Sequence, residues 1–251
     1  MEAYTDFADV YDTFMDATPY EEWCEFLVRI LEEYKVPKGL LLDLGCGTGT
    51  LTEMLSREGY DMIGVDNSEQ MLAIAMEKRE ASGENILYLL QDMREFELYG
   101  TVGAVISVCD SLNYLLEEED LVQTFKLVNN YLDPNGIFIF DFNTVYKYQE
   151  VIGDATIAEN REDCSFIWEN FYHEEEEINE YDLTIFVRED DEHFRKFDEN
   201  HFQRGYRLEQ MKEALELAGM EFVKALDADT HEEVTETSER IYCIARECGK
   251  E

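Results

Sequence analysis

The sequence predicts an α/β fold, in which a doubly wound sheet carries an antiparallel β-ribbon inserted after its fifth strand. Strand and helix signals alternate from about residue 40 to residue 143, the pattern of a parallel sheet with covering helices. The stretch 102–108 is apolar on both faces, as a central strand must be. Around 181–188 apolar and polar residues alternate, which is typical of a strand with one buried and one solvated face.

The alternating part of the chain supplies the main sheet and its helices. The expected strands are 40–43, 61–66, 86–90, 102–108 and 137–140, and the expected helices are 50–57, 68–80 and 118–132. Asn67 is expected to cap the second of these helices. The composition of 133–136 (Asp-Pro-Asn-Gly) is that of a turn. An amphipathic helix over 20–34 comes before the first strand.

The rest of the chain is expected to cap the sheet and to complete it. Ribbon strands are expected at 165–172, 181–187 and 194–202, and the four glutamates 174–177 are expected to form a solvated hairpin tip. After the ribbon we expect a helix that starts at Leu208 and is ended by Gly219, and then closing strands at 221–226 and 240–246. We therefore expect an N-terminal helical lid segment (1–35), a core formed by 36–143 and 205–251, and an inserted cap on the substrate side (144–204).

A glycine-rich turn is the most informative stretch of the chain. It reads Leu-Leu-Asp-Leu-Gly-Cys-Gly-Thr-Gly over 41–49, a buried strand that runs into three glycines at alternate positions. Glycine lets the backbone pass close to a ligand. We expect Thr50 to cap the next helix, with Glu53 completing a capping box. A dinucleotide-binding turn would need Gly-x-Gly-x-x-Gly, but position 50 is Thr.

This turn resembles the first motif of the class I S-adenosylmethionine (SAM) dependent methyltransferases. The likeness rests on Gly-x-Gly-x-Gly preceded by Asp43 two residues earlier. It covers 36–143 and, less closely, the closing segments. The resemblance implies a seven-stranded sheet with its last strand antiparallel, SAM as the cofactor, and transfer of a methyl group to a small-molecule acceptor.

The resemblance also implies which residues hold the cofactor. Ligands of such sheets bind beyond the carboxyl ends of the strands. The expected contacts are Asp43, Gly45, Cys46, Gly47 and Gly49 at the methionine part, Asp66 at the ribose hydroxyls, Asn67, Met71, Asp92 and Met93 around the adenine, and Cys109 through its backbone. Asp66 has the alternative role of a helix-start acid. In the aromatic group Tyr4, Phe7 and Tyr11, Tyr11 is the candidate lid over the sulfonium, and simple packing over the sheet is the alternative.

The acceptor side offers less specific candidates. His201 is a candidate base and Tyr206 a candidate orienting group, with Tyr11 as a third catalytic candidate; Asn113, Asp141, Asn143, Trp168 and Arg204 are candidate substrate contacts. Structural roles remain open for each: helix capping for Asn113, a strand end for Asp141 and Asn143, and packing for Trp168. Alignment of the reactants can contribute about 7–11 kcal/mol, so no catalytic pair is required by the chemistry.

Composition limits the partners and the compartment. The chain has 59 acidic and 20 basic residues among 251, a formal charge of −39, which disfavours nucleic acid as a partner. Solubility is one reason for this charge, and a preference for cationic acceptors such as amines is another. The six cysteines suggest free thiols rather than disulfides or a metal site. We expect a cytoplasmic monomer or homodimer, with no signal peptide and no membrane span.

Two other functions stay open. One is a nicotinamide-dependent oxidoreductase, against which Thr50 counts because it replaces the third glycine. The other is a non-catalytic protein that binds SAM as a sensor or an assembly factor. Methylation of a protein substrate is a variant of the first function.

Overall fold

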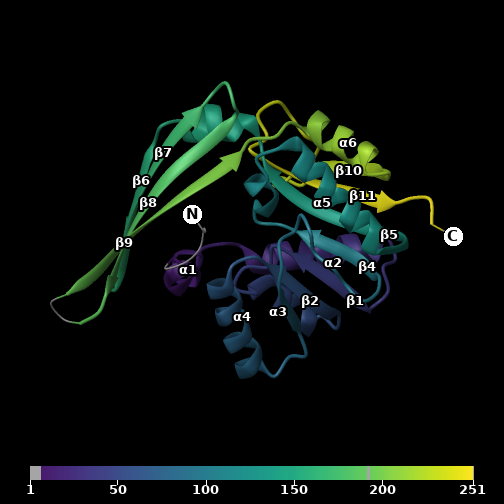
Figure 1. Cartoon of the computed structure of the whole chain (residues 1–251), viewed down its shortest axis with the longest axis horizontal. Helices are drawn as coiled ribbons and strands as arrows, with labels where there is room; N and C mark the ends of the chain where they lie inside the picture. The colour runs from purple at the N-terminus through teal and green to yellow at the C-terminus, as the bar shows by residue number, and fades with distance from the viewer. Residues whose placement is uncertain (1–6, 191–192, 251) are drawn as a thin grey trace.

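The computed structural model describes residues 7–190 and 193–250 and contains two sheets. In Figure 1 a sheet covered by helices occupies the right-hand side, and a long curved ribbon sheet stands to its left. The seven-stranded sheet has the order β10-β11-β5-β4-β1-β2-β3. Its strands are β1 (Leu40–Leu44), β2 (Asp61–Asp66), β3 (Leu87–Leu90), β4 (Val102–Ser107), β5 (Leu132–Asn143), β10 (Met220–Asp227) and β11 (Arg240–Glu247).

The topology confirms the predicted sheet. Strands β1 to β5 pair in parallel. Strand β11 lies between β5 and β10 and runs antiparallel to both. The strand order therefore reverses at β1, whose neighbours β2 and β4 lie on opposite sides, and a crevice opens at such a switch point.

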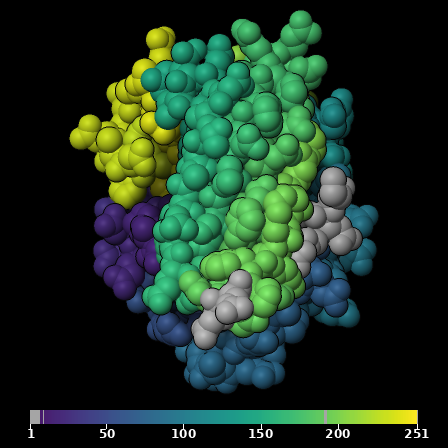
Figure 2. All heavy atoms as spheres, turned by 90° about the vertical axis from the view of Figure 1, so that its left-hand side faces the viewer, coloured from purple at the N-terminus to yellow at the C-terminus, as the bar shows by residue number. Residues whose placement is uncertain are grey.

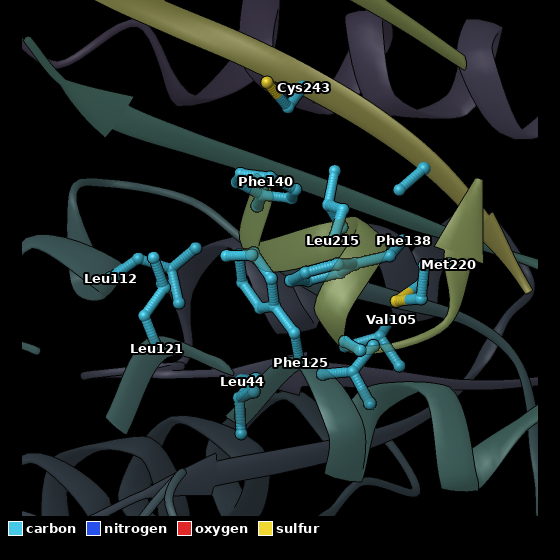
Figure 3. Close-up of a cluster of buried hydrophobic side chains, with 14 of the residues drawn as sticks. Leu44, Val105, Leu112, Leu121, Phe125, Phe138, Phe140, Leu215, Met220 and Cys243 are labelled. Atoms are coloured by element: carbon cyan, nitrogen blue, oxygen red, sulfur yellow. The ribbon is translucent and has the colours of Figure 1, made fainter. Parts of the chain in front are cut away.

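Helices cover both faces of this sheet. Helices α2 (Tyr20–Glu33), α3 (Thr50–Arg57) and α4 (Glu69–Ser82) pack on one face, and α5 (Glu118–Tyr131) and α6 (Leu208–Leu217) on the other. Figure 3 shows Phe125 of α5 and Leu215 of α6 against Phe138 and Phe140 of β5. Each of these side chains is fully buried, and burying one large apolar side chain contributes about 1.5–3 kcal/mol. The packing keeps the carboxyl ends of the strands in fixed positions.

The second sheet is the inserted cap. It contains β6 (Thr156–Asn160), β7 (Cys164–His173), β8 (Ile178–Arg188) and β9 (Phe194–Arg204), all antiparallel and in sequence order. In Figure 2 its teal and green atoms form a band that runs from the top of one face of the molecule toward the bottom, with the main-sheet part of the chain visible on either side. Helix α1 (Ala8–Phe14) packs on the inner side of the cap, where Val10 meets Leu183 and Ile185.

Several local expectations were wrong. The helix after β2 is capped by Ser68, whose hydroxyl accepts a 3.1 Å hydrogen bond from the Met71 N–H, and not by Asn67. Residues 133–136, which were expected to form a turn, are part of β5, and the pairing register between β5 and β4 shifts there. Strand β6 and the π-helix η2 (Lys147–Ile152) were not predicted. Within the described ranges, no helix has the length and apolarity that crossing a bilayer needs.

Candidate active site

A cavity of about 380 Å³ opens at the switch point of the sheet. Its walls come from the loops that follow β1, β2, β3 and β4, together with residues of α1 and α2. Predicted cofactor residues that line it are Tyr11, Asp43, Gly45, Cys46, Gly47, Asp66, Asn67, Met71, Asp92, Met93 and Cys109. The structure thus brings together segments from four successive strands.

The glycine turn is held in a conformation that side chains would not tolerate. Gly45, Gly47 and Gly49 have φ values of 81°, 53° and 73°, in the left-handed region that glycine adopts readily. A Cβ at Gly45 would come within 2.6 Å of Ser111, and one at Gly49 would strike the Tyr88 ring. A Cβ at Gly47 would meet nothing within 4 Å. The backbone at Gly47 therefore borders open space on the cavity side.

Helix α3 does not begin as predicted. Gly49, in the left-handed conformation, is its N-cap, and Thr50 is its first residue, so the expected Thr50–Glu53 capping box is absent. The Thr50 hydroxyl instead accepts a 2.8 Å hydrogen bond from Nζ of Lys78 on α4. Lys78 also forms a 2.5 Å ion pair with Asp12, and Asp12 accepts a 2.7 Å hydrogen bond from Thr48. These bonds fasten α1 to the glycine turn.

Asp66 stands at the end of β2 with its carboxylate directed at the glycine turn. Its Oδ2 accepts a 2.8 Å hydrogen bond from the Gly47 N–H, and its Oδ1 accepts one of 2.9 Å from the Ser68 N–H. Burial raises the pKa of Asp66, against the lowering effect of these bonds. A carboxylate in this place is suited to accept hydrogen bonds from sugar hydroxyls.

Asp43 lies beneath the turn. It is 3% exposed, and its Oδ2 accepts a 2.6 Å hydrogen bond from the Thr52 hydroxyl of α3. Burial raises the pKa of Asp43 to about 6, and the nearby charge of Asp66 adds to the effect. The side chain therefore fastens β1 to α3 beside the cavity.

Asp92 follows β3 and is already engaged. Its carboxylate forms a 2.6 Å ion pair with Arg94, and the hydrogen bonds from Arg94 lower the pKa of Asp92. The Arg94 guanidinium also lies 3.2 Å from Asp120. Asp92 and Met93 both line the cavity. An incoming amino group would share the carboxylate of Asp92 with Arg94.

The loop after β4 is shaped by a buried charge cluster. Cys109 and Asp110 both have positive φ, 64° and 53°, which is uncommon outside glycine. Asp141 holds this backbone, because its two oxygens accept hydrogen bonds from the Cys109 N–H (3.1 Å) and the Asp110 N–H (2.8 Å). Arg240 of β11 lies 2.9 Å from Asp110 and 3.6 Å from Asp141. Burial raises the pKa of the Cys109 thiol to about 12, so that thiol stays protonated.

Most of the predicted acceptor contacts do not line the cavity. Asp141 is fully buried in the cluster just described. Asn113 is also fully buried; its amide donates to the Asn143 and Arg204 carbonyls at 2.9 and 2.7 Å and accepts from the Asn143 N–H. Asn143 donates to the Tyr148 hydroxyl at 3.0 Å. Direct substrate contact by Asp141, Asn113 or Asn143 does not fit these positions.

The remaining acceptor-side candidates lie in the core or in the cap. Tyr206 is fully buried and its hydroxyl donates to the Leu115 carbonyl, so a role as orienting group does not fit. Arg204 donates to the Leu116 carbonyl at 2.9 Å. Trp168 packs on Tyr181 on the inner side of the cap. His201 is 2% exposed and does not line the cavity. Tyr4 lies outside the described residues.

Other cavity residues were not singled out by the sequence. Tyr20 and Tyr114 line the cavity together with Tyr11, whose hydroxyl is 3.8 Å from the Cys109 sulfur. Tyr20 sits at the start of α2, where the sequence showed only amphipathic periodicity. Tyr114 follows β4, so its place after a strand of the sheet was the available signal. Lys78 and Arg240, which do not line the cavity but hold the segments around it, gave no signal because their partners are distant in the sequence.

The fold and the cavity together indicate the class of protein. This is a doubly wound α/β protein with a cavity at the switch point of its sheet, lined by a glycine turn and by an acid at the next strand end. The residues present fit the SAM group: an open backbone edge at Gly47 for its amino-acid tail, and the Asp66 carboxylate for its ribose.

Comparison with known proteins identifies the family. Residues 41–136 match a family model described as a methyltransferase domain. YqeM of Bacillus subtilis (strain 168), which is named as a methyltransferase, is 38% identical over 244 residues, 97% of this chain and 96% of its own. The crystal structure of a SAM-dependent methyltransferase from Clostridium acetobutylicum superimposes with a TM-score of 0.89 at 30% identity, covering 99% of this chain and 100% of that one. The chain belongs to the SAM-dependent methyltransferases.

A further relative covers a smaller part of the chain. The dTDP-3-amino-3,4,6-trideoxy-alpha-D-glucopyranose N,N-dimethyltransferase of Streptomyces venezuelae is 29% identical over 155 residues, 61% of this chain and 62% of its own. The family-model match and the two relatives that cover nearly the whole chain establish the enzyme class and the cofactor, and the acceptor is a separate question.

Proposed function

We propose that this enzyme methylates a small-molecule acceptor at the end of the cavity that Tyr11, Tyr20 and Tyr114 line. The observation that carries the proposal is the continuity of the cavity: one space of about 380 Å³ is lined by the glycine turn, by Asp66, by these three rings and by Cys109. That volume is in the range of small-molecule sites. The Streptomyces relative is named for an amino-sugar substrate, which supports an acceptor of this size.

The cofactor roles that we propose follow the lining of the cavity. The turn 45–49 would receive the amino-acid tail at the start of α3, Asp66 the ribose hydroxyls, and Asp92 with Met93 the adenine, with Asn67 and Met71 beside it. Within the expected lid segment 1–35, α1 would serve as the lid, because α2 packs on the sheet. Residues 36–143 with 205–251 would form the catalytic core, and 144–204 the cap on the acceptor side.

Methyl transfer needs alignment more than covalent chemistry. SAM supplies an electrophilic methyl group on a sulfonium, and the acceptor attacks it in line. The protein holds the two reactants: the glycine turn and Asp66 on one side, and the tyrosine-lined end on the other. Holding reactants in this way contributes about 7–11 kcal/mol. Closure by α1 and the cap would exclude water from the reacting atoms.

The charge of the chain and its thiols support the partner and compartment that we propose. A formal charge of −39 disfavours RNA as the acceptor. All six cysteines are free, as in a reducing cytoplasm. We propose a cytoplasmic enzyme that is a monomer or a homodimer, which light scattering will distinguish.

The test is calorimetric titration with S-adenosylhomocysteine (SAH), followed by turnover of methyl-labelled SAM. SAH binding with transfer of label to a small-molecule fraction is the expected result. SAH binding without turnover in a metabolite extract would indicate a sensor. Binding of NADH in place of SAH would contradict the proposal outright.

A further inference from the structure

A chain of hydrogen bonds leads from the cavity into the cap. Tyr114, the last residue of η1 (Ser111–Tyr114), lines the cavity, and its phenol oxygen lies 3.1 Å from Nδ1 of His201. The same oxygen lies 2.9 Å from the Tyr181 hydroxyl. The phenol thus connects the cavity wall to a titratable side chain on β9.

The far nitrogen of His201 is matched to a carboxylate. His201 Nε2 is 3.1 Å from Oε2 of Glu199, and the two side chains are 1% and 4% exposed. The Phe7 N–H donates to the other Glu199 oxygen at 2.9 Å. Tyr181 stacks on the imidazole ring, with centroids 5.0 Å apart and planes 10° apart. Among the described residues, the titratable groups that contact His201 include Tyr114 from η1, Tyr181 from β8 and Glu199 from β9.

This order of groups fixes a proton path. With Glu199 ionised and the imidazole neutral, Nε2–H donates to the carboxylate and Nδ1 accepts from the Tyr114 hydroxyl. A proton arriving at Nδ1 would form an imidazolium beside Glu199, and the second hydrogen bond to Glu199, from the Phe7 N–H, would help to offset the desolvation of this buried pair. The arrangement is that of a base oriented by a third group.

The cavity itself favours a cation. Among the described residues that line it, Asp43, Asp66, Glu69 and Asp92 are acidic, whereas Arg94 is basic. The rings of Tyr11, Tyr20 and Tyr114 add faces that attract cations. An amine in this field is held as its ammonium form, which has no lone pair for attack. A bound amine must therefore lose a proton before it can react.

We propose that the acceptor is a primary or secondary amine, and that Tyr114 removes its proton with the help of His201 and Glu199. This inference rests on the proposed function. The ammonium N–H gives its proton to the phenol oxygen as the phenol proton moves to Nδ1 of His201, and Glu199 stabilises the imidazolium. The nitrogen lone pair then forms the N–C bond, the S–C bond breaks, and its electron pair stays on sulfur as a neutral thioether. The proton on His201 returns through Tyr114 to solvent when the product leaves.

Two amines of similar shape test the relay. Ethylamine is an ammonium ion at neutral pH, whereas 2,2,2-trifluoroethylamine is largely neutral and needs no base. We expect His201→Asn to lower the rate of SAH release with ethylamine by about 10²-fold. With trifluoroethylamine the rate should change by less than about threefold, because asparagine keeps a hydrogen bond to Tyr114 and loses only the proton transfer.

The controls separate the relay from folding and from the proposed function. His173→Asn removes a histidine that pairs with Glu180 at 2.9 Å in a solvent-exposed position of the same sheet, and should leave both rates unchanged. SAH titration of His201→Asn should match the wild type, and thermal unfolding measures the cost of removing the buried partner of Glu199. Equal losses with both amines would reduce His201 to a structural role, and no SAH release from either amine by the wild type would reject the amine acceptor. Failure of the wild type to bind SAH would instead overturn the proposed function.

A spectroscopic measurement needs no acceptor. The chain has four histidines, so nitrogen-15 NMR of histidine-labelled enzyme with SAH bound can resolve His201, assigned through His201→Asn. We expect the neutral ring protonated at Nε2, with Nδ1 accepting from Tyr114. A ring protonated at Nδ1 would contradict the relay.

Discussion

The Gly47 N–H donates a 2.8 Å hydrogen bond to Oδ2 of Asp66, which joins the turn after β1 to the end of β2. The two features that were read separately from the sequence are therefore one unit. The bond holds the Asp66 carboxylate at the rim of the turn, where a ligand that touches the Gly47 backbone also meets the acid.

Asp66→Asn tests the acid of this unit. The amide keeps a bond to Gly47 but loses the charge that strengthens hydrogen bonds to hydroxyl groups, worth about 1.5–3 kcal/mol. The expected result is a loss of SAH affinity of roughly 10- to 150-fold by calorimetry. Asp61→Asn, at the exposed opposite end of β2, is the matched control and should bind SAH normally. Unchanged affinity in Asp66→Asn would remove Asp66 from the site.

Gly49→Ala should damage the turn itself. A Cβ there would strike the Tyr88 ring, and φ is 73°. Gly59→Ala has a φ of 91° but meets nothing within 4 Å, so it shares the backbone strain without the collision. We expect Gly49→Ala to lose at least about 1 kcal/mol more in urea unfolding than Gly59→Ala, and to bind SAH more weakly. Equal losses would show that strain alone matters.

Lys78→Met should loosen α1 from the glycine turn. The ammonium group contacts Thr48, Thr50 and Asp12, at 3.1, 2.8 and 2.5 Å. Without it Asp12 keeps its bond to Thr48 alone, so limited proteolysis should cut the segment before α2 faster. Lys212→Met, which removes a Glu209 ion pair within α6 and a cation–π contact with Phe222 of β10, is the control because these partners lie outside α1. If the two variants are cut at the same rate, Lys78 does not hold α1.

Arg240→Met should be the most destabilising of these changes. Its side chain is 17% exposed and lies between Asp110 and Asp141, and removing one partner of a buried charge cluster costs about 3–5 kcal/mol. Arg246→Met, on the same strand with a partner at 3.7 Å and 35% side-chain exposure, should cost less than about 1 kcal/mol. Urea unfolding measures both, and similar values for the two would contradict the role of Arg240 in holding the loop after β4.

Asp43 should make the protein less stable as the pH rises. Burial raises its folded-state pKa to about 6 from an ordinary value of 3.8. Its contribution is thus fully present below pH 3.8 and is lost as the pH passes through about 6. The two-unit shift corresponds to roughly 3 kcal/mol. Asp43→Asn should therefore be more stable than the wild type at pH 7, and the difference should vanish near pH 4, in urea unfolding measured across that range. If the difference in unfolding free energy between Asp43→Asn and the wild type is the same at every pH, Asp43 does not cause the pH dependence. Another group, such as Asp66 or Asp141, whose pKa values burial also raises, would then cause it.

Features with local signals were predictable from the sequence. The turn 45–49 and Asp66 could be placed because glycine spacing and a strand end are properties of adjacent residues. The parallel sheet and the two-faced ribbon followed from the period of the apolar residues. Strand β6 was missed because most of its residues are exposed, so no buried face marks it.

The acceptor side could not be read because its contacts are distant in sequence. The sequence indicated that Asp141 is an acid at a strand end, but it forms an ion pair with Arg240, which lies 99 positions later in the chain. His201 was noticed, but Tyr114 lies 87 positions away and determines what the imidazole can reach. Burial of Asn113 and Tyr206 depends on how the cap joins the core, which local patterns do not encode.

The two ends of the inserted sheet meet at one place. Thr144 and Tyr206 form a bridge, and the Tyr206 N–H donates to the Asn143 carbonyl at 3.2 Å. The inserted segment 145–205 begins and ends at this one junction. Insertions and substitutions within the segment can therefore be accommodated without displacing β5 or α6. With this arrangement, the acceptor specificity can change during evolution while the site for the methyl donor is conserved.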